Sequence, residues 1–295
     1  MPLALAAECI LPSANGLGEV PQWHPETQTL WWCDVKVPAM VSYQPASGHS
    51  KTYPVEGKRI GSWAFMRSGG MLLAQEDGLY AWSPDSGKRT LLRHLASSWP
   101  NARLNDGRCD RKGRFWVGSM SETYREAPVG VFYRFDADFT LMPVFSEFTV
   151  PNSVTFSPDD RRMYFADSLI RKIFLFDFDL SEGRLSNKRL FRDCADAPGN
   201  PDGSTVDVDG CLWNAEFQGS RVVRYTPDGQ VDTVIELPVS QPTSCAFGGK
   251  DLDILYITTG AQNLTDAQRA QQPLAGGIFA LRPGTQGLPE PHFGP

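Results

Sequence analysis

The sequence predicts an all-β fold, a six-bladed β-propeller that carries a metal ion in its central channel. One pattern occurs six times along the chain. Each copy has an apolar strand, a turn, a second strand around Trp or Tyr, and a third strand that ends in an aromatic residue. The period is roughly 40 to 50 residues, which is typical of propeller blades of about four short strands. The second strands lie at 30–34, 70–74, 114–118, 162–166, 211–215 and 254–258.

The turns and the outer strands fit the same pattern. Ser157-Pro158-Asp159 and Asp207 to Gly210 are turns of the Ser-Pro-Asp and Asp-x-x-Gly types, which join the first and second strands. Third strands follow at 78–82, 130–135 and 221–225. The apolar stretch 2–11 is expected to be a strand that completes the last blade, beside Thr258 and Phe279. Residues 264–272 are expected to form a short helix within that blade.

The composition limits the kind of protein. The 295 residues are expected to form one domain, 1–295, because six repeats leave no stretch for a linker. There are 34 acidic and 28 basic residues, so no nucleic-acid partner is expected. No run reaches transmembrane length, and no Lys or Arg precedes the apolar start, so neither a membrane partner nor a signal peptide is expected. The six cysteines have no C-x-x-C spacing, which favours reduced thiols and a cytoplasmic protein.

The starts of the innermost strands carry the functional signal. Alignment of the six copies places a polar residue at the same point of each: Glu19, Ser62, Asn105, Asn152, Asp202 and Thr243. Innermost strands run side by side along the channel of a propeller, so these residues are expected to form a ring at one mouth. Carboxylate and amide oxygens are the ligands that Ca²⁺, Mg²⁺ or Mn²⁺ requires. The alternative is that Asn and Asp stand there because they favour turns before strands.

Two other kinds of site are disfavoured. The four histidines, His24, His49, His94 and His292, lie in different turns without i, i+4 spacing, so a zinc site built on histidines is not expected. Ser62 and Ser244 have no nearby His, which argues against a serine nucleophile.

An ordered set of motifs across nearly the whole chain resembles the regucalcin/gluconolactonase family, also called the senescence marker protein family. The motifs are Leu17-Gly18-Glu19-Val20-Pro21-Gln22-Trp23, Asn105-Asp106-Gly107, Gly118-Ser119-Met120, Pro201-Asp202-Gly203, Cys245-Ala246-Phe247-Gly248-Gly249 and Leu274-Ala275-Gly276-Gly277-Ile278-Phe279. The resemblance implies a six-bladed propeller that binds one divalent cation and, in most bacterial members, hydrolyses sugar lactones. By motif, Glu19, Asn152 and Asp202 fall on the metal ligands.

The resemblance also implies that Arg103, Asn105 and Glu122 contact the substrate. Arg103 stands two residues before Asn105, so on an extended segment both side chains point to one side, and Arg103 is a candidate to stabilise an oxyanion. Glu122 follows a strand and is expected on a loop over the channel mouth. Many members have Gly after the Asn ligand, where this chain has Ser153, a change expected to narrow the floor of the site.

Lactone hydrolysis follows chemically from such a site. A cation held by two carboxylates and an amide polarises a carbonyl or lowers the pKa of water. Asp202 is a candidate general base, and the alternative is that it serves only as a ligand. The cation is left open among Ca²⁺, Mg²⁺, Mn²⁺, Zn²⁺ and Fe²⁺. The expected partner is a small sugar lactone, such as a glucono-, galactono-, xylono- or arabinonolactone.

Several alternatives remain open from the sequence. The same site suits a hydrolase of other esters or phosphoesters, and also a non-catalytic calcium-binding regulator. Trp99 and Tyr124 are candidates to flank a sugar ring, and Glu216 is a candidate to reach the channel. The oligomeric state is not predicted.

Overall fold

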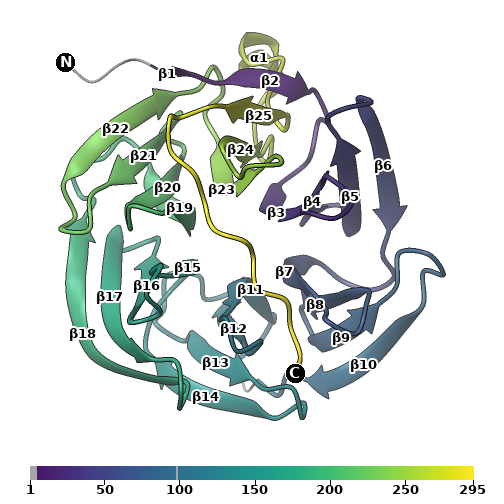
Figure 1. The fold of residues 1–295 in the computed structure, drawn as a ribbon, viewed down its shortest axis with the longest axis vertical. Coiled ribbons are helices and arrows are strands. Elements are labelled where there is room, and N and C mark those ends of the chain that lie inside the picture. The colour runs from purple at the N-terminus through teal and green to yellow at the C-terminus, as the bar shows by residue number, and fades with distance from the viewer. Residues whose placement is uncertain (1–4, 98) are drawn as a thin grey trace.

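Six separate sheets surround a central channel in the computed structural model, which describes residues 5–97 and 99–295 (Figure 1). Five sheets have four strands and one has five. The predicted all-β, six-bladed propeller is therefore confirmed. The single short helix, α1, has six residues, and within the described residues no helix has the length and hydrophobicity needed to cross a membrane.

The first five blades follow the chain order, each as antiparallel strands running from the channel outward. Blade 1 contains β3 (Gly18–His24), β4 (Thr29–Asp34), β5 (Ala39–Gln44) and β6 (His49–Pro54). Blade 2 contains β7 (Ile60–Phe65), β8 (Met71–Gln75), β9 (Gly78–Trp82) and β10 (Arg89–His94). Blade 3 contains β11 (Ala102–Cys109), β12 (Phe115–Ser121), β13 (Val131–Phe135) and β14 (Leu141–Ser146). Blade 4 contains β15 (Pro151–Phe156), β16 (Arg162–Asp167), β17 (Lys172–Asp179) and β18 (Arg184–Asp193). Blade 5 contains β19 (Asn200–Val206), β20 (Leu212–Phe217), β21 (Arg221–Tyr225) and β22 (Val231–Glu236).

The sixth blade closes the ring with a strand from the N-terminal part of the chain. It contains β23 (Pro242–Gly248), β24 (Ile254–Thr259), β25 (Ile278–Leu281) and β2 (Glu8–Leu11), with Cys9 opposite Phe279. The predicted closing strand is confirmed, although residues 2–4 of the expected stretch lie outside the described residues. An unforeseen strand, β1 (Leu5–Ala6), pairs in parallel with β22 of blade 5, so the N-terminal segment joins two blades. The predicted helix is α1 (Asp266–Gln271), capped by Thr265.

Neighbouring blades are held together by apolar clusters. Trp63 of blade 2 packs with Cys33 and Met40 of blade 1, and Trp116 of blade 3 packs near Phe178 of blade 4. Burial of one such side chain contributes about 1.5–3 kcal/mol, so these inter-blade clusters stabilise the ring as a whole. All six cysteines are free thiols, and five of them are buried.

Each innermost strand bends at its ring residue. The strands β3, β7, β11, β15, β19 and β23 lie side by side in that order around the channel. The register of each shifts there, as between Glu19 and Gln22 or between Asn152 and Thr155. Such a β-bulge adds an unpaired residue and redirects the side chains. The ring residues therefore lie inside the strands rather than just ahead of them, because pairing continues past the bulge to Gly18 and Pro151.

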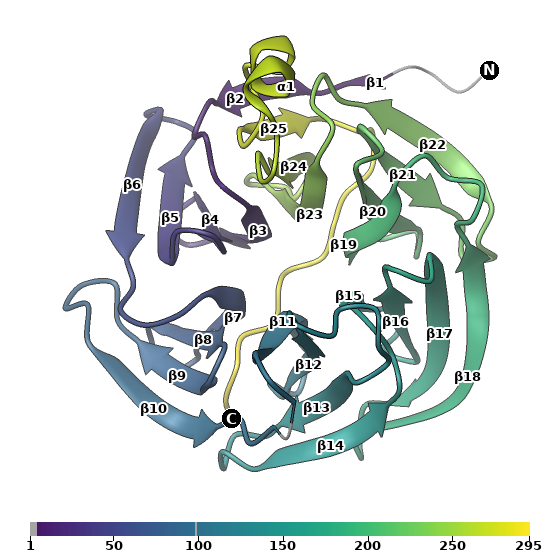
Figure 2. The same ribbon diagram turned by 180° about the vertical axis from the view of Figure 1, so that it is seen from behind.

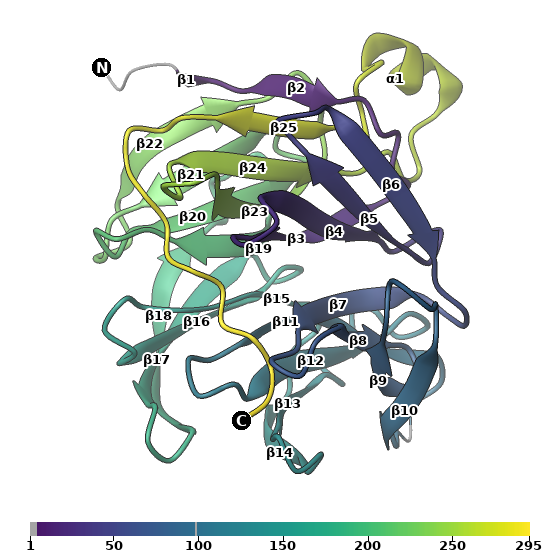
Figure 3. The same ribbon diagram turned by 45° about the vertical axis from the view of Figure 1, so that its right-hand side comes forward.

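The C-terminal segment, residues 282–295, crosses one mouth of the channel. It passes in front of the ring in Figure 1 and behind it in Figure 2. Backbone pairing joins Gly287 to Asp207 of blade 5 and Phe293 to Met66 of blade 2. Figure 3 shows this segment and α1 on opposite sides of the ring. The segment covers the mouth at which the innermost strands end, and leaves open the mouth at which they begin.

Candidate active site

A pocket of about 490 Å³ lies at the open mouth. All six side chains that the sequence singled out for metal or substrate line it, and they come from four blades: Glu19, Arg103, Asn105, Glu122, Asn152 and Asp202. The predicted ring is therefore brought together, although Ser62 and Thr243 do not line the pocket. They instead donate hydrogen bonds to the carbonyl oxygens of Gly107 and Gly18, which tie neighbouring strands together.

The carboxylates of Glu19 and Asp202 lie in this pocket without a cationic partner. Neither forms a salt bridge or a hydrogen bond with another side chain in the described part of the chain. Burial raises the pKa of both well above the ordinary range, and repulsion from Asp202 and Asp106 adds to the shift at Glu19. Buried carboxylates are costly unless they are paired with a cation or coordinate a metal. This pair therefore has the electrostatics of a cation site.

The side chain of Asn152 is held in a fixed orientation. Its Nδ2 donates to Ser168 Oγ at 2.8 Å, and that hydroxyl donates to the Pro201 carbonyl at 2.7 Å. Its Oδ1 therefore faces the pocket, where it accepts a hydrogen bond from Asn105 Nδ2 at 3.0 Å. An amide oxygen held in this way is a suitable neutral ligand beside two carboxylates.

Asp106 is a third acidic group that the sequence pattern did not single out. Its carboxylate accepts a hydrogen bond from the Val154 backbone at 2.9 Å, and burial raises its pKa. The bulge between Leu104 and Gly107 allows the side chains of both Asn105 and Asp106 to face the channel. Regular alternation along the strand would direct one of the two side chains to the opposite face of the sheet. The Asn105-Asp106-Gly107 motif was the only sign of this.

These donors suit a hard divalent cation. Two carboxylates and one amide oxygen match the oxygen preference of Ca²⁺, Mg²⁺ or Mn²⁺. Within the described residues no group of three or more His, Cys, Asp or Glu side chains forms a metal site. The candidate set therefore depends on the Asn152 amide together with Glu19 and Asp202.

Arg103 is fixed on one side and free on the other. Its Nε donates to Glu122 Oε1 at 2.5 Å, and its Nη1 donates to Asn105 Oδ1 at 2.5 Å and to the Leu104 carbonyl at 3.1 Å. Its Nη2 has no hydrogen-bond partner in residues 5–97 and 99–295. The guanidinium is thus oriented by protein groups and keeps one amino group available for a ligand.

Glu122 lies on the loop between β12 and β13, as expected. Its Oε1 forms salt bridges with two arginines, with Arg103 Nε at 2.5 Å and with Arg59 Nη1 at 3.1 Å. Although burial opposes the shift, Arg103 and then Arg59 lower the pKa of Glu122. Its second carboxylate oxygen makes no such contact in the described structure and can accept from a ligand hydroxyl.

Ser153 does not narrow the pocket, so that expectation was wrong. Its side chain is fully buried beneath the site, and its Oγ donates to the Asp202 carbonyl at 2.5 Å. Its φ of 58° is in the left-handed region, which explains why glycine suits this position. Ser153 therefore supports the backbone of Asp202 instead of contacting a ligand.

Three further sequence candidates lie outside the pocket. Glu216 is fully buried within blade 5, where it pairs with Arg221 at 2.7 Å and accepts a hydrogen bond from Tyr225. Trp99 and Tyr124 are exposed and pack edge to face at 5.9 Å. None of the three lines the pocket.

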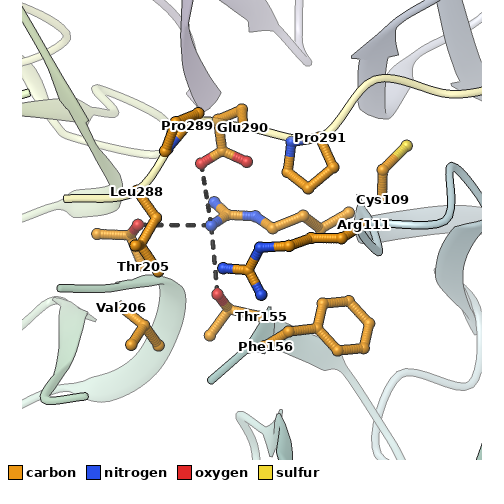
Figure 4. A pocket seen from close by; sticks show the side chains of 11 residues that line it. Cys109, Arg111, Thr155, Phe156, Thr205, Val206, Leu288, Pro289, Glu290 and Pro291 are labelled. Carbon is orange, nitrogen blue, oxygen red and sulfur yellow. Dashed lines mark hydrogen bonds and ion pairs between the residues drawn. The ribbon is translucent and has the colours of Figure 1, made fainter. Parts of the chain in front are cut away.

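A second pocket, of about 340 Å³, lies at the covered mouth (Figure 4). Figure 4 shows Glu290 pointing into it from the C-terminal segment. Its carboxylate lies 3.2 Å from Arg108 Nη1, which also donates to Thr155 at 3.3 Å and Thr205 at 3.5 Å. Both charged side chains are less than a tenth exposed. This ion pair fastens the segment to the innermost strands.

We expect Glu290→Ala to destabilise the fold, because it leaves the buried Arg108 guanidinium without its counter-charge. The free energy of unfolding should fall by about 3–5 kcal/mol, as measured by urea denaturation. The matched control is Glu182→Ala, which removes the same charge from an exposed turn. Equal stability of the two variants would contradict the structural role of this ion pair.

The raised pKa values of Glu19 and Asp202 predict a pH-dependent response to metal. The folded-state pKa lies above the unfolded value of 4.5 for Glu19 and of 3.8 for Asp202. The stability that these protonated groups contribute is therefore fully present at a pH below the unfolded values, and it is lost as the pH rises through the folded-state pKa. A bound cation relieves this loss. We expect CaCl₂ to raise the Tm, relative to EDTA, more at pH 7 than at pH 5. Asp202→Asn should flatten this difference, and an equal Tm shift at both pH values would count against it.

The fold and the pocket define a six-bladed propeller with carboxylate and amide oxygens and an oriented arginine in a pocket at one mouth of its channel. The sequence profile described as SMP-30/gluconolactonase/LRE-like region matches residues 17–261. The chain belongs to this family, which confirms the resemblance noted from its motifs.

Similar proteins match over nearly their full length. A protein of Pseudomonas putida named 6-deoxy-6-sulfogluconolactonase is 33% identical over 97% of this chain and 98% of its own. A protein of Azospirillum brasilense named L-arabinolactonase is 36% identical over 97% of this chain and 95% of its own. The crystal structure of a calcium-binding protein, regucalcin, from Agrobacterium tumefaciens superposes with a TM-score of 0.91 at 30% identity, covering 98% of both chains.

Proposed function

We propose that this chain is a hydrolase that opens sugar lactones to aldonic acids with the help of one divalent cation held by Glu19, Asn152 and Asp202. One observation carries the proposal: the buried carboxylate of Asp202 and the partly buried carboxylate of Glu19, neither with a cationic partner, share a pocket with an arginine that keeps one amino group free. Two similar proteins are named as lactonases, which supports the same substrate class.

The reaction needs charge stabilisation at one oxygen. Hydrolysis of a lactone, a cyclic ester, builds negative charge on the former carbonyl oxygen. When bound, a divalent cation supplies Lewis-acid polarisation of that carbonyl and lowers the pKa of water. Arg103 Nη2 donates to the same oxygen as its charge grows, and the hydrogen bonds from Arg103 to Glu122 and Asn105 keep the guanidinium in place.

Asn105 and Glu122 select the sugar. The free oxygen of the Glu122 carboxylate accepts hydrogen bonds from ring hydroxyls, and Asn105 borders the same space. A lining of arginine, amide and carboxylate groups suits a hydroxyl-rich ring better than an apolar ester.

Asp202 has two roles in this proposal, as a ligand and as the acceptor of the proton from the attacking water. Burial and Asp106 raise its pKa in the metal-free protein, whereas a bound dication would lower it and weaken the carboxylate as a base, so the two roles oppose each other. If Asp202 acts only as a ligand, Asp202→Asn at saturating metal should recover most of the wild-type kcat; if it also takes the proton, kcat should stay low.

The direct test is proton release when D-glucono-1,5-lactone or D-xylono-1,4-lactone is added to protein supplied with Ca²⁺, Mn²⁺ or Zn²⁺, with EDTA as the control. We expect EDTA-sensitive release above the spontaneous rate. Metal binding by calorimetry without turnover of any aldonolactone would favour a calcium-binding regulator, a reading suggested by the regucalcin structure. Turnover of p-nitrophenyl acetate or a phosphotriester alone would favour the other hydrolase class.

A further inference from the structure

The pocket also carries a cluster of positive charge that the proposed lactone chemistry does not use. Lys36 lies in the turn between β4 and β5, Arg59 directly precedes β7, and Arg125 lies on the loop after β12. We call these three side chains the basic rim. They come from blades 1, 2 and 3, and all line the pocket.

The basic rim is poorly neutralised. Arg59 shares the Glu122 carboxylate with Arg103, and its other acidic neighbour, Glu76, lies 3.5 Å away. Lys36 and Arg125 form no salt bridge within residues 5–97 and 99–295. The pocket therefore holds four cations, Arg103 included, beside three carboxylates, and among the carboxylates only Glu122 forms salt bridges with them.

The basic rim borders both the pocket and the solvent. Arg59 is partly buried, and Lys36 and Arg125 are exposed. Burial lowers the pKa of Lys36, and the positive charge of Arg59 lowers it further. The three cationic groups line the same pocket and so share its mouth.

A neutral sugar lactone provides no charge to offset this cluster. Ring hydroxyls accept hydrogen bonds, but they leave like charges facing one another in a partly desolvated pocket. An anionic group would relieve that repulsion and form charge-assisted hydrogen bonds with guanidinium and ammonium donors. The anion must lie away from the lactone carbonyl, because Glu19 and Asp202 would repel it at the other side of the pocket.

We propose that the basic rim binds an anionic substituent, a phosphate, sulfonate or carboxylate, carried by the sugar lactone at a carbon distant from its carbonyl. This inference rests on the proposed lactonase function and narrows its substrate class.

The test compares matched lactones. The ratio of kcat/KM for 6-phospho-D-glucono-1,5-lactone to that for D-glucono-1,5-lactone is measured for the wild type and for Arg125→Gln, Lys36→Gln and the double variant. We expect a wild-type ratio of about 100, a fall of about tenfold in each single variant and a ratio near one in the double variant. The control is Arg184→Gln, which removes the same charge from exposed β18 and should keep the wild-type ratio. D-glucaro-1,4-lactone and the 6-sulfonate analogue distinguish carboxylate and sulfonate from phosphate.

A binding measurement separates this proposal from the lactonase function. Calorimetry of 6-phosphogluconate and gluconate needs no turnover. If no lactone is opened but 6-phosphogluconate binds at least tenfold tighter than gluconate, and Arg125→Gln abolishes the difference, the lactonase proposal fails and the anion site stands. A wild-type ratio near one with equal binding of both acids, or equal losses on both lactones in the rim variants, overturns the anion site.

Discussion

Asp202→Ala is expected to abolish metal-supported lactone hydrolysis while the propeller stays folded. The Asp202 carboxylate has no salt bridge or hydrogen bond to another side chain within the described structure, so its removal breaks only its hydrogen bond with the Gly203 backbone and relieves repulsion with Glu19 and Asp106. A bound dication would lose an anionic ligand, which should weaken binding by about 3–5 kcal/mol, roughly 150- to 5,000-fold. Glu19→Gln and Asn152→Ala should act in the same direction, the neutral ligand less strongly.

The measurements are calorimetric titration of metal, thermal unfolding in EDTA and the rate of proton release. We expect the metal-free Asp202→Ala protein to be at least as stable as the metal-free wild type, with turnover lost. Asp228→Ala serves as the control, since it removes the same charge from an exposed turn of the same blade. Wild-type turnover by Asp202→Ala in EDTA would place the reactive centre elsewhere.

Much of this site could be predicted because a propeller repeats one unit around an axis. Alignment of six copies places equivalent positions at equal heights along the channel, so the ring that includes Glu19, Asn152 and Asp202 was predicted without contact information, and the family resemblance then singled out these three. The same repeat predicted the closing strand, because the last blade lacked an outer strand and the chain began with an apolar one. Positions that recur in every blade can therefore be predicted from the sequence.

The parts that were missed do not repeat with the blade. A β-bulge at Asn105 breaks the two-residue alternation, and this is why Asp106 escaped notice. Lys36, Arg59 and Arg125 stand on connecting turns and loops whose lengths differ between blades, so nothing in the periodicity brings them together. The C-terminal segment pairs with strands of blades 2 and 5 that are distant in sequence, and only the fold places Glu290 against Arg108.

Arg103→Ala should separate catalysis from metal binding. Arg103 is not a candidate ligand, and its positive charge lies near the carboxylates, so its loss should leave the metal affinity unchanged or slightly higher. If Nη2 meets the lactone carbonyl, its hydrogen bond strengthens as charge grows on that oxygen, and kcat should fall by about 100-fold or more. If it meets only a hydroxyl, the contact is equal in the ground and transition states, and mainly KM should rise.

Two further variants decide between these roles. Arg103→Lys keeps the positive charge, but an ammonium group cannot reproduce the planar guanidinium that donates to Glu122, Asn105 and a ligand at the same time. If the orientation of the guanidinium is needed for catalysis, this variant should recover little of the lost kcat. Glu122→Gln keeps the side-chain shape and leaves Arg103 bonded to Asn105, so it should raise KM more than it lowers kcat and should alter the preference among lactones that differ in hydroxyl configuration. Steady-state kinetics beside metal titration measures both effects. If Arg103 contacts the substrate, Arg103→Ala must change kcat or KM while the cation stays bound. Unaltered kinetics on every lactone, or loss of the metal from this variant, would show that Arg103 does not have this role.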